Sequence, residues 1–152
     1  MIHSSIEIAA PPELVRKILL DFPNIPKWHS GFVQEIRKDD PLKTLEQGDG
    51  ISGTMGGVSF TAWILEYTPQ KLSWTGPKVL GLFAGIHDFG FEPSKKIDGG
   101  TTFVQEESYV GILWWIFMPW LPMGWLVKGY FDGFGRDMKR EAERQVAETA
   151  AH

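Results

Sequence analysis

The chain has 152 residues, of which 43% are hydrophobic, and a formal net charge of -4 at pH 7. This length suits one hydrophobic core, so we expect a single domain spanning residues 1–152. The scattered charges include no basic block for a phosphate backbone, so we expect no nucleic-acid partner. The absence of cysteine excludes disulfides, thiolate-bound zinc and a cysteine nucleophile. Residues 1–7 lack the basic start and apolar run of a secretory signal, which predicts a cytoplasmic location.

The N-terminal part of the chain predicts a strand followed by two short helices. Residues 2–8 alternate apolar and polar side chains, as a half-buried strand does. Pro12 suits the first turn of a helix, which ends before Pro23, and residues 24–30 allow one further turn. The alternation then resumes and predicts a second strand at residues 32–37.

The middle of the chain predicts an antiparallel meander. Tight turns separate the expected strands, and Gly56-Gly57 supplies the positive φ angles that a two-residue hairpin turn needs. Strands joined in this way, without helical crossovers, exclude a doubly wound parallel sheet. The expected strands are residues 50–55, 58–67, 71–75, 82–91 and 101–110.

Residues 110–127 are uncharged over eighteen positions, about the lower limit for a membrane span. We expect no span, because Pro119 and Pro122 would interrupt the helix. Four further tryptophans are too many for a small core to absorb fully, so the segment is a buried wall, a mobile lid or a surface that touches a membrane transiently through residues 112–127. These tryptophans are Trp114, Trp115, Trp120 and Trp125.

The C-terminal part predicts one long helix of about 25 residues, because apolar side chains recur every three or four positions. Four glycines in its first half each cost about 1 kcal/mol relative to alanine, which indicates close approach to a sheet or a mobile gate. They are Gly124, Gly129, Gly133 and Gly135.

This order of elements resembles that of the START/Bet v 1-like superfamily, also called SRPBCC or helix-grip proteins. Residues 6–15 (IEIAAPPELV) and Asp21-Phe22-Pro23 with Trp28 look like its opening strand and helices. The runs HDFGFEP at 87–93, GGTTF at 99–103 and QEESYVG at 105–111 resemble the late hairpin of polyketide cyclase/dehydrase-like members.

The resemblance implies an α+β helix-grip fold, in which a curved antiparallel sheet of about seven strands surrounds a long C-terminal helix and two short helices follow strand 1. It also implies an internal cavity that binds a hydrophobic small molecule without a cofactor. No metal is expected, since the four histidines lack ligand spacing.

Side chains alternate along a strand, and phenylalanines mark which face of the late hairpin is internal. On this face we expect Gly85, His87, Phe89 and Phe91 from one strand and Thr101, Phe103, Gln105, Glu107 and Tyr109 from the next.

A hairpin symmetric about residues 93–100 would place Phe89 near Phe103 and His87 near Gln105, with Glu107 one diagonal step away. The sequence therefore predicts a cluster of histidine, glutamine and glutamate side chains inside an apolar cavity.

The candidate catalytic residues are His87, Glu107 and Tyr109. A histidine beside a carboxyl group in a low dielectric suits proton transfer near neutral pH. His87 would be the general acid or base, Glu107 would orient it or share its proton, and Tyr109 would donate a hydrogen bond to an enolate. The alternative is structural, because buried polar side chains commonly satisfy one another.

The candidate ligand-binding residues are aromatic, apart from one amide that would hydrogen-bond a substrate oxygen. They are Trp28, Trp74, Phe89, Phe91, Phe103, Gln105, Phe131 and Phe134.

Three functions remain open. The first is cofactor-free cyclisation, dehydration or isomerisation of a polyketide-like or other secondary metabolite. The second is a non-catalytic carrier or sensor of a lipid, quinone or metabolite. The third is a protein-interaction module that uses exposed tryptophans, which a filled interior would favour. Both a monomer and a dimer are compatible with the sequence.

Overall fold

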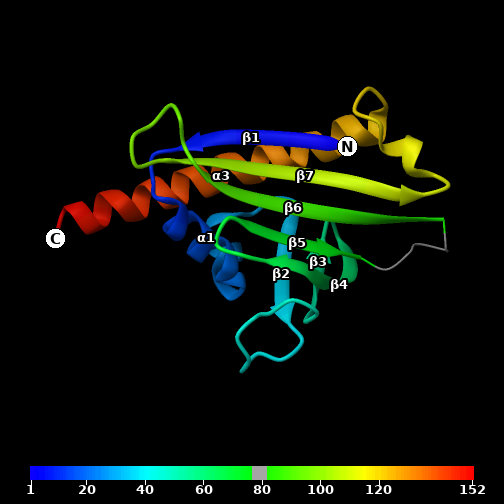
Figure 1. Ribbon diagram of the computed structural model, residues 1–152, viewed down its shortest axis with the longest axis horizontal. Coiled ribbons are helices and arrows are strands. Elements are labelled where there is room, and N and C mark those ends of the chain that lie inside the picture. Colours follow the sequence, from blue (N-terminus) through cyan, green and yellow to red (C-terminus); the bar gives the residue numbers. More distant parts are fainter. Residues whose placement is uncertain (77–81) are drawn as a thin grey trace.

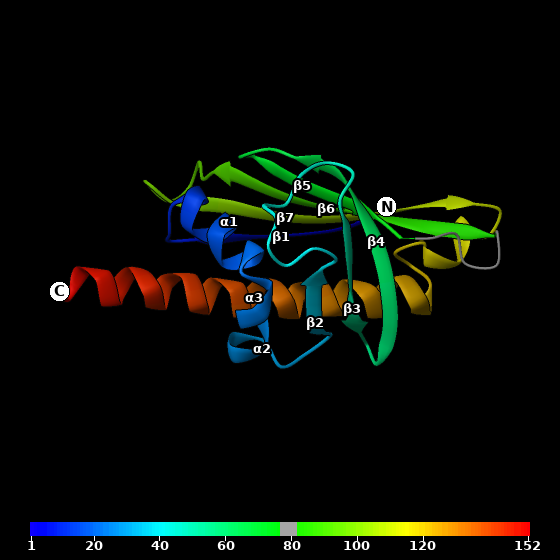
Figure 2. The same ribbon diagram turned by 90° about the horizontal axis from the view of Figure 1, so that it is seen from below.

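The structure is a computed structural model that describes residues 1–76 and 82–152. Seven antiparallel strands form one sheet in the order β1-β7-β6-β5-β4-β3-β2, and this sheet curls around the long helix α3 (Figures 1 and 2). The elements are β1 (Ile2–Ile8), α1 (Pro12–Leu20), η1 (Phe22–Asn24), α2 (Ile25–Trp28), β2 (Val33–Lys38), β3 (Gly50–Met55), β4 (Val58–Tyr67), β5 (Lys71–Thr75), β6 (Phe83–Pro93), β7 (Thr101–Gly111), η2 (Trp114–Phe117) and α3 (Pro122–Ala150). The predicted helix-grip architecture is thus confirmed.

Local sequence signals account for the ends of several elements. Gly56 and Gly57 have φ angles of 57° and 79°, and they form the expected two-residue turn between β3 and β4. Pro122, expected to interrupt a helix, instead lies in the first turn of α3, where its missing N–H costs no hydrogen bond. The helix is therefore 29 residues long, rather than about 25.

The β6–β7 register differs from the expected one by two residues. Phe91 lies opposite Phe103, and His87 lies directly opposite Glu107. The expectation was wrong because β6 continues to Pro93, which pairs with Thr101, so that the hairpin turns later in the chain. A shift of two residues preserves the alternation, so each side chain stays on its predicted face.

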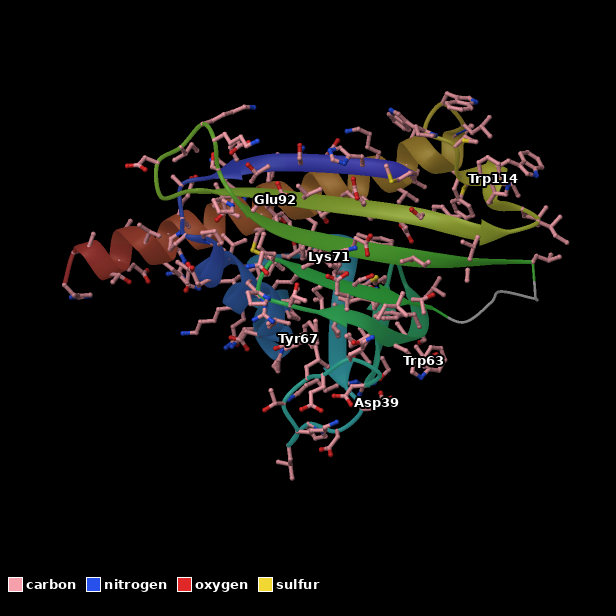
Figure 3. The ribbon with its side chains drawn as sticks, in the orientation of Figure 1. Asp39, Trp63, Tyr67, Lys71, Glu92 and Trp114 are labelled. Atoms are coloured by element: carbon pink, nitrogen blue, oxygen red, sulfur yellow. The ribbon has the colours of Figure 1, made fainter. Side chains whose placement is uncertain are left out.

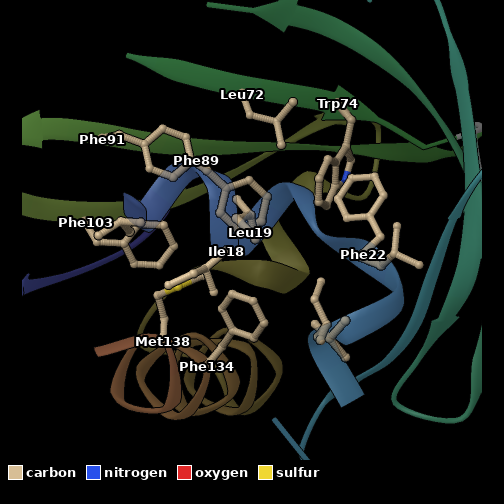
Figure 4. Close-up of a cluster of buried hydrophobic side chains, with 14 of the residues drawn as sticks. Ile18, Leu19, Phe22, Leu72, Trp74, Phe89, Phe91, Phe103, Phe134 and Met138 are labelled. Carbon is tan, nitrogen blue, oxygen red and sulfur yellow. The ribbon is translucent and has the colours of Figure 1, made fainter. Parts of the chain in front are cut away.

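The core fills the space between the sheet, the short helices and α3 (Figure 4). Phe134 and Met138 project from α3 toward Phe89 and Phe103 of the sheet, and Leu19 of α1 lies in the middle of the cluster. The helix also lies along β1, where Ser4 donates a hydrogen bond to Asp132 at 2.5 Å. None of the helices described here is long and apolar enough to cross a membrane.

Candidate functional site

The candidate site lies between the concave face of β5–β7 and the first half of α3. The three strands contribute Trp74, His87 and Gln105, because alternation turns these side chains away from solvent. Phe131 and Phe134 of α3 approach the same region and are 2% and 4% exposed. The sequence therefore identified a group of residues that the fold brings together.

His87 is enclosed by aromatic rings. Its imidazole stacks on Phe89 with ring centroids 4.2 Å apart, and Trp74 and Phe131 lie at 5.5 and 4.7 Å. Burial lowers the pKa of His87 to about 3, although the negative charge of Asp88 opposes the shift. The imidazole is thus neutral at pH 7, and its buried Nε2 has no hydrogen-bond partner in the described part of the chain.

Glu107 faces His87 across the β6–β7 ladder. Its carboxyl group lies over Gly85, where an added Cβ would be only 2.8 Å from Oε1, so the glycine makes room for it. Burial raises the pKa of Glu107 to about 7, and a hydrogen bond from the Tyr109 hydroxyl partly opposes this shift. Glu107 accepts a hydrogen bond from Tyr109, whereas Nε2 of His87 has no partner among the described residues, so no hydrogen bond joins this nitrogen to Glu107.

Gln105 and Tyr109 connect the site to the segments that cover it. The Gln105 side chain donates a hydrogen bond of 2.8 Å to the carbonyl of Phe131, which ties β7 to α3. The Tyr109 ring stacks on Phe117 of η2 with centroids 3.9 Å apart. Burial, together with the charge of Glu107, raises the pKa of Tyr109 above its usual range.

The interior is nearly filled. The space lined by Trp74, His87, Gln105 and the neighbouring rings has a volume of about 10 Å³, close to the minimum that one water needs. The expected ligand-sized cavity is therefore not open here, and a filled interior is the condition that favours an interaction module with exposed tryptophans. The larger hollow of about 820 Å³ lies elsewhere, where Phe22, Pro26 and Ile36 line a groove along the edge strand β2.

Three of the predicted ligand-binding residues lie away from this interior space. Phe91 and Phe103 pack against each other deeper in the core, with centroids 5.8 Å apart. Trp28 packs on Phe134 at 5.3 Å and lines a surface cleft beside α1. Their spacing in the sequence indicated burial but not depth within the core.

Sequence reasoning missed two features that shape the site. Phe32 and Tyr130 stack at 4.4 Å and link the start of β2 to α3, a contact that no local pattern indicates. The role of Gly85 in leaving room for the Glu107 carboxyl group was also missed, although an isolated glycine within a strand often marks a close approach.

His29 was also passed over as a structural link. Its Nδ1 donates to Asp137 at 2.7 Å, and its Nε2 accepts the N–H of Val33 at 3.3 Å, a tautomer assigned from these partners. This histidine fixes the loop after α2 to α3. No cluster of three potential metal ligands occurs in residues 1–76 or 82–152.

A curled antiparallel sheet that grips one long C-terminal helix is the fold of the START/Bet v 1-like class of proteins. Within that class, residues 2–143 match the family described as polyketide cyclase / dehydrase and lipid transport, and the chain belongs to this family. No curated protein matches the sequence.

Solved structures share the fold at low sequence identity. A hypothetical protein from Helicobacter pylori has a TM-score of 0.73 at 13% identity, with 92% of this chain and 86% of that chain covered. A START superfamily protein from Mycobacterium smegmatis has a TM-score of 0.65 at 15% identity, with 95% and 97% covered. The di-domain ARO/CYC protein StfQ of the steffimycin biosynthetic pathway has a TM-score of 0.67 at 14% identity, with 97% of this chain but 46% of StfQ covered.

Proposed function

We propose that the chain binds a hydrophobic small molecule between the concave face of the sheet and the first half of α3. The observation that carries this proposal is the buried Nε2 of His87, which has no partner among the residues described. An unpaired buried polar atom costs about 1–3 kcal/mol, a cost that a polar group on a bound ligand would remove. The rings of Trp74, Phe89 and Phe131 would contact the apolar body of that ligand.

Binding requires the interior to expand, because the present space is only about 10 Å³. The ring pairs Phe32–Tyr130 and Tyr109–Phe117 connect the sheet side to α3 and η2. Neither pair is covalent, and an aromatic pair contributes about 0.5–1.5 kcal/mol beyond its burial. In this proposal their separation admits the ligand.

A catalytic role is the second candidate, and the pKa of Glu107 near 7 favours it. A carboxyl group with that pKa can both give and accept a proton at neutral pH. Glu107 would transfer the proton, with Tyr109 beside it, while the neutral His87 would orient the substrate by a hydrogen bond. The reaction would be a cofactor-free cyclisation, dehydration or isomerisation of a polyketide-like or other carbonyl compound. If the protein does not convert its ligand, it is a carrier or sensor of a lipid, quinone or metabolite.

The proposal includes a cytoplasmic location and contact of residues 112–127 with a membrane that supplies or receives the ligand. Support for the contact comes from the side chains of Trp120 and Trp125, which are 76% and 73% exposed. Large exposed apolar side chains in one segment commonly mark an interaction surface.

Native mass spectrometry of the protein purified from its own host would test the proposal. We expect an apolar metabolite with the wild type, much less of it with His87→Ala, and wild-type amounts with Asp88→Asn, whose side chain lies on the outer face beside Lys71. An unaltered metabolite retained equally by wild type and Glu107→Gln indicates a carrier, whereas conversion only by the wild type indicates an enzyme. Equal occupancy in wild type and His87→Ala would overturn the assigned site.

A further inference from the structure

One end of the molecule exposes many apolar side chains. We call residues 110–126 the apolar cap; it comprises the end of β7, η2 and the first turn of α3. Figure 1 places it at the end of the molecule opposite the C-terminus, and Figure 3 shows Trp114 there. Its exposed side chains include Ile112, Trp114, Trp115, Trp120, Trp125 and Leu126. This concentration far exceeds the isolated exposed apolar residues that a soluble surface normally carries.

The apolar cap carries no charge. No Asp, Glu, Lys or Arg occurs from residue 108 to residue 127. The next cation, Lys128, pairs with Asp132 at 2.7 Å. Because the whole chain has a net charge of -4, electrostatic attraction cannot hold this surface to an anionic partner.

The backbone of the apolar cap is folded on itself. The N–H groups of Ile116, Met118 and Leu121 donate to the carbonyls of Leu113, Trp115 and Met118 at 2.9–3.2 Å. Gly124 fits the same turn, since a Cβ there would be 2.2 Å from the Met118 carbonyl oxygen. These bonds reduce the number of unpaired peptide groups that the cap would bring to an apolar boundary.

We propose that the apolar cap docks on an uncharged, zwitterionic phospholipid surface. Tryptophan favours the boundary between headgroups and acyl chains, and the cap's position at one end lets a flat bilayer reach it. Apolar transfer drives the contact, so salt does not weaken it. The inference rests on the membrane contact in the proposed function and adds the lipid class and the binding mode.

The same element also covers the candidate site. Phe117, which stacks on the Tyr109 ring at 3.9 Å, belongs to η2 between Trp114 and Trp120. A cap held at the bilayer boundary therefore places the Tyr109–Phe117 contact near the lipid. In this proposal a hydrophobic ligand passes between membrane and interior where that contact separates.

The test is co-flotation of the full chain with phosphatidylcholine vesicles, at low and high salt. We expect binding that salt does not reduce and that added phosphatidylserine does not strengthen. The double variant Trp120→Ser/Trp125→Ser should lose at least about tenfold in vesicle affinity, since each side chain gives up a large apolar burial. Trp63→Ser is the matched control, because Trp63 is 47% exposed on β4, outside the apolar cap (Figure 3).

The outcomes separate the two proposals. Absence of wild-type binding, or binding that needs anionic lipid and fails at high salt, would overturn the docking proposal. A cap variant that converts a dimer to a monomer without changing vesicle binding would instead assign the surface to a second copy. Vesicle binding by a protein whose interior takes up no apolar fluorophore would leave docking in place and remove the cavity function.

Discussion

At the residue scale, two polar groups on facing strands carry opposite pKa shifts. Burial lowers the pKa of His87 to about 3 and raises that of Glu107 to about 7, so that both favour the neutral form. The cause is shared: apolar rings and strands exclude the water that would stabilise either charge. An uncharged interior of this kind suits the apolar ligand proposed above and leaves a carboxyl group able to exchange protons at neutral pH.

Glu107→Gln should flatten the stability of the protein between about pH 4.5 and 7. The pKa of Glu107 is higher in the folded protein than its ordinary value, so the folded state binds this proton more tightly than the unfolded chain does. The free energy of unfolding is therefore highest below about pH 4.5, and it falls as pH rises through 7. The loss in the wild type is at most about 3 kcal/mol. Urea unfolding of both proteins across this range measures it, and parallel pH profiles would contradict the shift.

His87→Leu should stabilise the protein, most strongly in acid. The folded pKa of about 3 lies below the ordinary 6.5, so the wild type has its full stability above pH 6.5 and loses it as pH falls toward 3. The variant does not lose stability in this way. It also lacks the unpaired nitrogen, which destabilises the wild type by about 1–3 kcal/mol. Urea midpoints at about pH 4 and pH 7.5 test this. A stability gain that does not depend on pH would show that protonation is not involved.

At the scale of single elements, the glycines of α3 divide into two kinds. Gly135 meets Gln105 and Ile6 of the sheet at 3.4 Å, which confirms the expected close approach there, whereas Gly124 meets the Met118 carbonyl at 2.2 Å, in the turn before the helix and not in the sheet. A Cβ at Gly129 meets nothing within 4 Å, and one at Gly133 meets only the Arg136 side chain at 3.8 Å. Packing does not require these two glycines, and they weaken the part of the helix that covers the site.

Gly129→Ala and Gly133→Ala should each stabilise the protein by about 1 kcal/mol, because alanine restricts the unfolded chain and fits the available space. Gly124→Ala is the contrasting variant and should destabilise it. Guanidinium unfolding ranks the three. If the first half of α3 must move to admit a ligand, the two stabilised variants will also take up an apolar fluorophore more slowly.

At the scale of the whole molecule, one hydrophobic cluster joins distant parts of the chain. Ile8 of β1, Leu19 of α1, Leu72 of β5 and Met138 of α3 belong to it, and each is completely buried. The sheet closes around the helix because β1, from the start of the sequence, pairs with β7, from its later part. Removing either end of the chain would expose the same core.

The chain should therefore unfold in a single transition as one domain. Far-UV circular dichroism and tryptophan fluorescence during urea unfolding should give coincident curves, since the tryptophans report on β5, the apolar cap and the region around α2. A separate early transition in fluorescence would contradict a single domain and identify the apolar cap as an independent unit.

Local patterns in the sequence were enough to predict the element types, their order and the faces of the strands. Alternation along β6 and β7 assigned His87 and Glu107 to the interior because side-chain direction is a local property of an extended backbone. The same local rules placed the Gly56-Gly57 turn and the long helix, although the start of α3 at Pro122 was missed.

The register, the filled interior and the hydrogen bonds of the polar cluster depend on contacts between elements that are distant in the sequence. The register of β6 and β7 depends on where the hairpin closes, and the contact of Tyr109 with Phe117 depends on how η2 folds back. The Phe32–Tyr130 stack joins residues about a hundred positions apart. Such contacts are set by packing between elements, which has no periodic signature in a single sequence because many arrangements satisfy the same apolar pattern.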